Sequence, residues 1–198
     1  MTWSTRTRSP YAPDESFTDD SAVKPGIVIL SEVRGELKGR ILEIQRRFDP
    51  KLANGLGPHI TITGSSGMGP FPSRTSEEEL REKLEPIARA TPPLELKFLP
   101  PMRFMQSNIV VLPLDPNGPL RQLHERIKMS GLKYEQPRFT FTPHITLNFF
   151  RELSPSELKE LLSVRLEQPL VIDRISAHRT TDQITSKKIL QLSLTGSG

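Results

Sequence analysis

The chain has 198 residues, of which 35% are hydrophobic and 25% charged, enough for one large domain that folds without cross-links. It contains no cysteine, which excludes disulfides, thiol nucleophiles and cysteine-ligated zinc or iron–sulfur sites. The formal net charge of +4 suits an anionic ligand but is too small to establish nucleic-acid binding.

Residues 1–25 are rich in Ser, Thr, Pro and Asp and lack hydrophobic periodicity, so we expect a loosely attached or disordered tail. They show no apolar stretch of the kind found in secretory signals. Nowhere does the chain hold the roughly 20 consecutive apolar residues that cross a bilayer. We therefore expect a protein without membrane association, in the cytoplasm or else the nucleus, with residues 26–198 folding as one monomeric domain.

The first folded segment predicts a strand, a helix and a second strand. Residues 27–30 form a short β-branched run, typical of a buried strand. Four apolar residues then fall on one face of a helix: Leu37, Ile41, Ile44 and Phe48. Residues 59–63 alternate as a second strand. The Gly- and Ser-rich residues 64–74 predict a mobile loop, either a lid over a site or a simple connection.

A further helix and a hairpin follow. The capping pattern that begins at Ser76 predicts the start of the helix, which Pro86 should kink or shorten. Residues 94–104 and 108–114 predict the two strands of a hairpin, the first interrupted by the prolines at 100–101.

The same order of elements then recurs. Apolar periodicity predicts a helix over residues 120–127 and alternation a strand over 144–149. Ser154 and the residues after it predict another capped helix, and residues 170–180 and 188–194 predict the last strands. We therefore predict an α+β fold with an internal duplication: two lobes related by a pseudo-twofold axis, antiparallel sheets lining a central cleft, and helices outside.

Each half carries one copy of a His-x-Thr motif, preceded by proline, at the start of the comparable strand. The two copies are His59-Ile60-Thr61-Ile62 and His144-Ile145-Thr146-Leu147. Because side chains alternate between the faces of a strand, each imidazole shares a face with its hydroxyl, and the apolar residues anchor the strand from behind. One such motif alone carries little information, but two at matching places predict one composite site.

The chemistry of this composite site fits a phosphodiester. Two imidazoles with ordinary pKa values near 6.5 can divide the work of acid and base near neutral pH. Two hydroxyls can donate hydrogen bonds to the non-bridging oxygens of a phosphate. We therefore predict that His59, Thr61, His144 and Thr146 are catalytic. No carboxylate stands at metal-ligand spacing from either histidine, so we predict neither a metal nor another cofactor.

These paired motifs, together with the segment Arg138-Phe139-Thr140-Phe141-Thr142-Pro143-His144, resemble the 2H phosphoesterase superfamily. This superfamily includes bacterial 2′-5′ RNA ligase-like proteins and eukaryotic cyclic nucleotide phosphodiesterases. The resemblance extends over about residues 26–195 in layout, although its specific content is the two short motifs. It implies a bilobal fold and hydrolysis of a 2′,3′-cyclic phosphate, on a nucleotide or an RNA end, to a 2′-phosphomonoester.

Substrate contacts are less specific in the sequence. Phe150 follows the second motif and fits either a base-stacking surface or core packing. Four more residues flank the motif strands and fit either phosphate and base contacts or ordinary surface positions: Tyr134, Arg103, Arg138 and Arg151. The other histidines fit other roles, His124 in a partly buried or surface position on a helix and His178 at the surface near a strand end.

The sequence is also compatible with three other functions. The same site would serve a 3′-5′ exoribonuclease, or a 2′-5′ ligase or phosphodiesterase acting on RNA. A protein of another class, a non-catalytic RNA-binding module, would use the pocket to dock a phosphate. Binding alone needs donors such as arginine rather than imidazoles, which favours an enzyme. A module gripping several phosphates would lose affinity steeply as salt rises.

Overall fold

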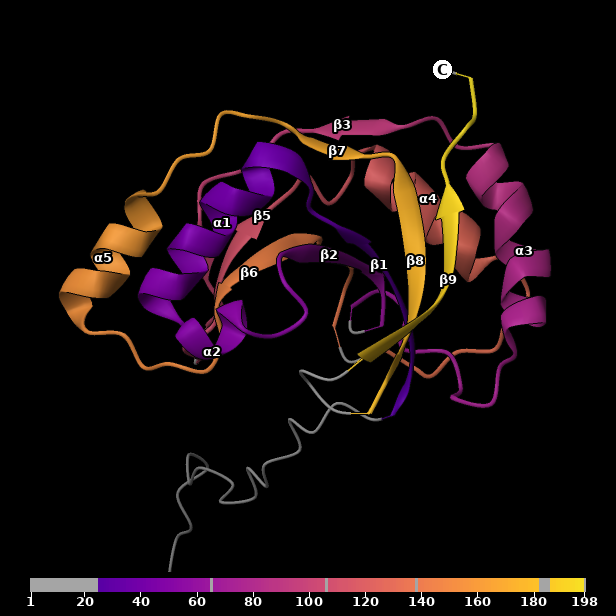
Figure 1. Cartoon of the computed structure of the whole chain (residues 1–198), viewed down its shortest axis with the longest axis horizontal. Helices are drawn as coiled ribbons and strands as arrows, with labels where there is room; N and C mark the ends of the chain where they lie inside the picture. The colour runs from indigo at the N-terminus through magenta and orange to yellow at the C-terminus, as the bar shows by residue number, and fades with distance from the viewer. Residues whose placement is uncertain (1–24, 65, 106, 138, 182–185, 198) are drawn as a thin grey trace, which may run out of the picture.

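The computed structural model describes residues 25–64, 66–105, 107–137, 139–181 and 186–197 (Figure 1). Apart from Pro25, the expected tail lies outside the described residues. The helices are α1 (Gly35–Phe48), α2 (Pro50–Ala53), α3 (Glu77–Arg89), α4 (Pro119–Lys128) and α5 (Pro155–Ser163). The strands are β1 (Gly26–Glu32), β2 (His59–Thr63), β3 (Leu94–Leu96), β4 (Met102–Arg103), β5 (Val110–Pro113), β6 (His144–Asn148), β7 (Leu170–Ile172), β8 (Arg174–Thr180) and β9 (Ser186–Ser193).

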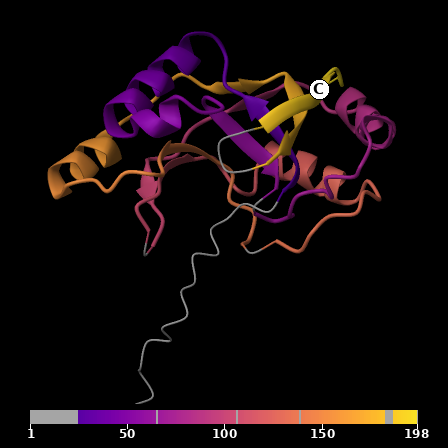
Figure 2. The same ribbon diagram turned by 60° about the horizontal axis from the view of Figure 1, so that its bottom comes forward.

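The strands form three antiparallel sheets with the orders β2-β1-β8-β9, β4-β5-β6 and β3-β7. Helices α3 and α4 lie beside the four-stranded sheet, whereas α1, α2 and α5 lie toward β5 and β6 (Figure 1). Figure 2 shows α1 and α5 toward one end of the molecule and α3 at the other end. The predicted α+β class with antiparallel sheets is confirmed. None of the helices among the described residues is long and apolar enough to cross a membrane.

The predicted internal duplication is visible in the order and the register of the strands. One half runs β1-α1-β2-α3-β3 and the other runs β5-α4-β6-α5-β7, with the short helix α2 added to the first. In each half the motif strand pairs antiparallel with the strand before it. Each pairing shifts register at the matching place, between Ile29 and Leu30 in one and between Val110 and Val111 in the other. The last strands of the halves, β3 and β7, pair with each other.

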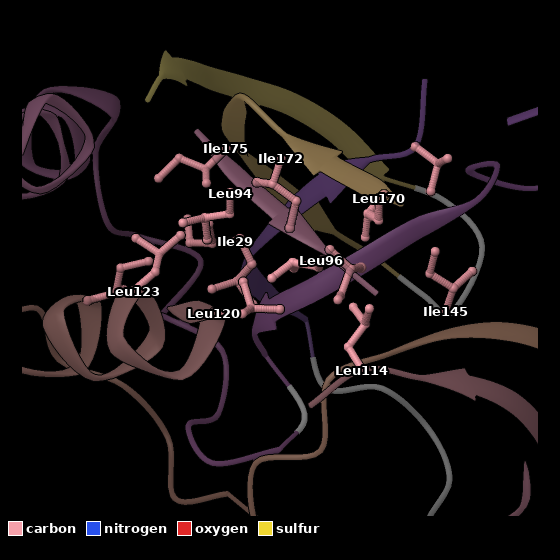
Figure 3. Packing of buried hydrophobic residues seen from close by; sticks show 14 of the residues in the cluster. Ile29, Leu94, Leu96, Leu114, Leu120, Leu123, Ile145, Leu170, Ile172 and Ile175 are labelled. Atoms are coloured by element: carbon pink, nitrogen blue, oxygen red, sulfur yellow. The ribbon is translucent and has the colours of Figure 1, made fainter. Parts of the chain in front are cut away.

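The hydrophobic core joins the sheets to the helices. Leu94 and Leu96 of β3 and Ile172 of β7 lie close to Ile29 of β1 and Leu120 of α4 (Figure 3). All of these side chains are buried. Burial of this kind stabilises the fold by roughly 25 cal/mol per Å² of apolar surface removed from water.

One predicted hairpin strand was wrong. Residues 94–104 do not form a single interrupted strand, because β3 pairs with β7 while β4 pairs with β5. The prolines at 100–101 have no N–H to donate, which separates the two pieces and lets them join different sheets. The hairpin itself is confined to β4 and β5.

Two other local predictions differ from the structure. Helix α3 continues past Pro86 to Arg89, so the proline does not end it. The expected mobile loop is packed in its described residues: Met68 and Phe71 are fully buried, and the amides of Gly67 and Gly69 donate to the carbonyls of Phe139 and Glu135. A side chain at Gly67 or Gly69 would collide with neighbouring atoms, so these glycines permit close packing rather than mobility. The segment is therefore not a free lid.

Candidate active site

The two motif strands lie next to each other although they belong to different sheets. β2 is an edge strand of the four-stranded sheet and β6 an edge strand of the three-stranded sheet, and the two are in contact. Figure 1 shows them side by side at the centre of the molecule. His59 is the first residue of β2 and His144 the first of β6. The fold thus brings together the two motifs that sequence reasoning paired.

The two imidazoles are held in the same way. Nδ1 of His59 donates to the carbonyl of Gly57 at 2.7 Å, and Nδ1 of His144 donates to the carbonyl of Thr142 at 2.7 Å. A carbonyl can only accept, so Nδ1 carries the proton in the neutral ring and Nε2 has a free lone pair. Both rings are therefore presented with Nε2 available, either to accept a proton or, once protonated, to donate one.

Burial and mutual repulsion shift the pKa values of both histidines. Burial lowers the pKa of His59, against a smaller opposing effect of its hydrogen bond to Gly57 and of the charge on Glu32. Burial likewise lowers the pKa of His144, and the charge of His59 lowers it further. Two rings that influence each other electrostatically in this way are placed to act on one bound group.

Helix α1 secures the second motif strand through two buried polar side chains that sequence reasoning missed. Gln45 Nε2 donates to the carbonyl of Thr146 at 2.8 Å. Asp49 accepts from the amides of Phe149 and Phe150 at 2.8 and 2.7 Å, and from the amide of Leu52 at 3.0 Å. Both side chains are almost fully buried. They satisfy backbone groups at the open edge of β6, which no neighbouring strand of its own sheet can reach.

Helix α4 secures the first motif strand in a comparable way. His124 is fully buried, and its Nδ1 donates to the carbonyl of Ile62 at 2.7 Å. Its ring stacks on Phe141 at a centroid distance of 4.1 Å, just before the second motif. The helix of each half thus braces the motif strand of the other half. The predicted position of His124, partly buried or at the surface, was wrong, because the ring is enclosed between Ile62 and Phe141.

His178 is not at the surface, contrary to expectation. It lies within β8 with 2% of its surface exposed, because the face of β8 that carries it is covered in the folded chain. Its Nε2 lies 3.1 Å from Ser176 Oγ and 3.7 Å from the carboxylate of Glu32. Lys188 Nζ lies 2.7 Å from that same carboxylate. A polar cluster therefore lies on the sheet that carries His59.

The predicted substrate contacts do not gather at the two histidines. Phe150 follows the far end of β6 from His144, and Lys51 Nζ lies 4.2 Å over its ring. Arg151 is tied to the carbonyl of Phe48 and, at 2.6 Å, to Glu157. Local pairing holds both side chains beside α1, α2 and α5, and their contact with a substrate stays a prediction.

For the remaining predicted contacts the structure gives local partners only, and their role in substrate binding stays a prediction. Arg103 bonds within its own turn, to the carbonyl of Ser107 and to Asn108 Oδ1. Tyr134 is half-buried and packs against the hydrophobic core. Arg138 lies outside the described residues. A residue that the sequence did not single out, Phe104, meets the ring of His144 edge-on at a centroid distance of 5.2 Å. It belongs to the β4–β5 hairpin, and its position depends on tertiary folding alone.

Within the described ranges, no group of three or more histidine or acidic side chains is arranged to hold a metal ion. The motif strands themselves carry two imidazoles, which can accept or donate a proton, and two partly exposed threonine hydroxyls, which can donate hydrogen bonds.

The pattern that defines the 2′-5′ RNA ligase superfamily matches residues 33–183 of the chain. The chain belongs to this superfamily. Its paired His-x-Thr motifs had already indicated the same group of phosphoesterases, and that prediction is confirmed. The superfamily places the chain among enzymes of the phosphodiester type.

One curated relative and two solved structures are similar to this chain. The Geobacillus kaustophilus protein GK0864, which carries the provisional name of a phosphoesterase, is 33% identical over 71% of this chain and 76% of its own length. The Thermus thermophilus protein TT0787 shares the fold with a TM-score of 0.58 at 16% identity, over 87% of this chain and 99% of its own. E. coli LigT, solved in complex with 3′-AMP, gives a TM-score of 0.56 at 16% identity over 86% of this chain and 98% of its own. The bacterial origin of these relatives gives the nuclear alternative no support.

Proposed function

We propose that the chain hydrolyses a 2′,3′-cyclic phosphate, on a nucleotide or an RNA end, to a 2′-phosphomonoester without a metal. The observation that carries the proposal is the matched presentation of His59 and His144 on adjacent strands, with Nδ1 of both engaged and neither Nε2 bonded to any of the residues that the structure describes. Membership of the superfamily supports phosphodiester chemistry at this pair.

In the proposed reaction, water attacks phosphorus in line with the bond to the ribose 3′ oxygen. His144 Nε2 takes the proton from water as the new P–O bond forms. The P–O3′ bond breaks, and His59, protonated on Nε2, gives its proton to the departing 3′ oxygen. The phosphate remains on the 2′ oxygen. The two histidines end with exchanged protonation states, and a proton transfer through solvent resets them.

Thr61 and Thr146 would bind the non-bridging phosphoryl oxygens in this scheme. Each lies two residues after its histidine on the same face of a strand and is partly exposed. A hydroxyl that donates to the developing charge on these oxygens contributes about 3 kcal/mol to the transition state when water is excluded.

The proposal is tested by measuring kcat/KM on a 2′,3′-cyclic mononucleotide in the presence of EDTA. His59→Ala and His144→Ala should each lower kcat/KM by about 10² to 10⁴, because each removes a positioned acid or base. Arg165→Ala removes an exposed cation bonded only to the carbonyls of Leu162 and Val164, and should leave kcat/KM unchanged. Turnover that requires a metal, or that survives both histidine substitutions, would contradict the proposal.

The match to the 2′-5′ RNA ligase superfamily favours one second function of the same site. If a 5′-hydroxyl of RNA replaces water as the nucleophile, the same bond to the 3′ oxygen breaks and a 2′-5′ linkage forms. Adding an RNA with a 5′-hydroxyl to the assay separates the two, since ligation yields a longer strand. Binding of RNA that weakens steeply with salt and yields no product would favour the non-catalytic module instead.

A further inference from the structure

The two motifs match, but their surroundings do not. Across the β1–β2 pair, His59 stands opposite Glu32, whereas across the β5–β6 pair His144 stands opposite Pro113. Residues directly opposite on antiparallel strands share a face, with Cβ atoms about 5 Å apart. His144 also meets the edge of the Phe104 ring. One imidazole therefore neighbours a carboxylate and the other neighbours apolar groups.

The carboxylate of Glu32 is held in its ionised form. Lys188 of β9 lies 2.7 Å from Glu32 Oε1, and this hydrogen bond is the main cause that lowers the pKa of Glu32. The charges of Lys188, His178 and Lys38 lower it further, while burial opposes them. At neutral pH the side chain beside His59 therefore carries a negative charge.

The other titratable groups that act on Glu32 or His59 are neutral or positive at neutral pH, so Glu32 supplies the negative charge next to His59. His178 of β8 has a pKa lowered to about 4, mainly by burial, and is neutral at neutral pH. His144 of β6, Arg174 of β8, Lys188 of β9 and Lys38 of α1 are neutral or positive. The carbonyl of Gly57 and the carboxylate of Glu32 both favour the imidazolium of His59. The carbonyl of Thr142 acts in the same way on His144, so the carboxylate is the contribution that differs between the two rings.

We propose that Glu32, held in place by Lys188, is a positioning residue that keeps the proton on His59, so that His59 acts as proton donor and His144 as proton acceptor. The asymmetry of neighbours, rather than the motifs themselves, sets the direction of proton transfer. The donor and acceptor roles rest on the proposed function, but the link between Glu32 and His59 does not.

The physical basis is a difference between the two sites. Burial disfavours the charged form of both rings. A carboxylate partner offsets part of that penalty at His59 alone, and a proton on His59 discourages a second proton on His144. As pH falls, His59 should gain its proton first.

An NMR titration of the histidine imidazoles in the free protein tests this without any substrate. The resonance of His59 is identified by its absence from the spectrum of His59→Gln. In Glu32→Gln the pKa of His59 should fall by about 0.5 to 1 unit. The expected shift is small because solvent screens the charge of a partly exposed carboxylate. In Lys188→Met it should rise, because Glu32 then lacks its compensating cation. Glu36→Gln, which removes an exposed carboxylate from the first turn of α1, is the control.

The opposite signs expected for the Glu32 and Lys188 variants distinguish positioning from structural damage, which would move both the same way. An unchanged pKa of His59 in Glu32→Gln, or shifts of the same sign in both variants, would overturn the proposal. In the pH profile of kcat/KM on a cyclic nucleotide, Glu32→Gln should shift the basic limb to lower pH and leave the acidic limb in place. If the pKa of His59 depends on Glu32 but the protein does not turn over the cyclic nucleotide, the proposed function is refuted. The electrostatic link between Glu32 and His59 is then still supported.

Discussion

At the scale of single residues, burial decides which histidines can carry charge. His178 is 2% exposed, and its pKa is lowered to about 4, below the value near 6.5 of an unfolded chain. Between these values the unfolded state binds a proton that the folded state does not. The resulting penalty is absent above pH 6.5 and grows as pH falls toward 4, reaching about 2 kcal/mol at pH 5.

We predict that replacing His178 makes the fold less sensitive to acid. Urea unfolding of the unmodified protein and of His178→Gln, each at pH 7.5 and pH 5, measures the free energy of unfolding. The loss on acidification should be about 2 kcal/mol larger with His178 present. The remaining histidines titrate in both proteins and cancel in the comparison. An equal loss in the two proteins would mean that His178 is not buried as a neutral ring.

The residues that carry the chemistry could be predicted because they form a local, repeated pattern. His59, Thr61 and their counterparts stand two residues apart on a strand, and alternation alone places them on one face. Glu32 could not be predicted in the same way, because its role depends on which residue faces it across a strand pair. The prediction that His178 lies at the surface was wrong for a related reason, because the burial of its face of β8 depends on segments that are distant in the sequence.

At the scale of elements, helix α1 holds the second motif strand through Asp49. This side chain is 1% exposed and accepts hydrogen bonds from three backbone amides, two of them just beyond β6. Removing it leaves those partly buried amides without this partner, and each orphaned donor costs about 1 kcal/mol.

Asp49→Ala should therefore lower the free energy of unfolding by about 3 kcal/mol, measured by urea denaturation. Asp115→Ala is a matched control, because Asp115 is exposed and accepts only from the nearby amide of Asn117. Its loss should stay near 1 kcal/mol or below. Equal destabilisation by the two substitutions would show that the hydrogen bonds of Asp49 do not stabilise the fold as proposed.

Helices and motif strands could be predicted from periodicity, whereas pairing over long distances could not. Leu37 and its neighbours at helical spacing marked α1, which the structure confirms. No feature of residues 94–96 indicated β7 as their partner, since a three-residue strand carries no register signal. The glycines of residues 64–74 were taken as a sign of mobility, but two of them serve close packing against residues 135 and 139.

At the scale of the whole molecule, duplication creates the site. Each half alone offers one imidazole and one hydroxyl on an edge strand. The β3–β7 pair and the crossed bracing by α1 and α4 bring the two edges together. The recurrence of elements made this arrangement predictable from the sequence. Its asymmetric surroundings were not predictable, because they depend on which residues of β1 and β5 face the histidines and on β4, β8 and β9, which have no counterparts in the repeated order.

The central claim is that both histidines act on one cyclic phosphate and that the bond to the 3′ oxygen breaks. Phosphorus NMR of a 2′,3′-cyclic mononucleotide incubated with the protein in EDTA tests it most directly. We expect a single new signal, that of the 2′-phosphomonoester, and no detectable conversion by His59→Ala or His144→Ala. A 3′-phosphomonoester would contradict the assigned leaving group, and conversion that persists in both variants would contradict the site itself.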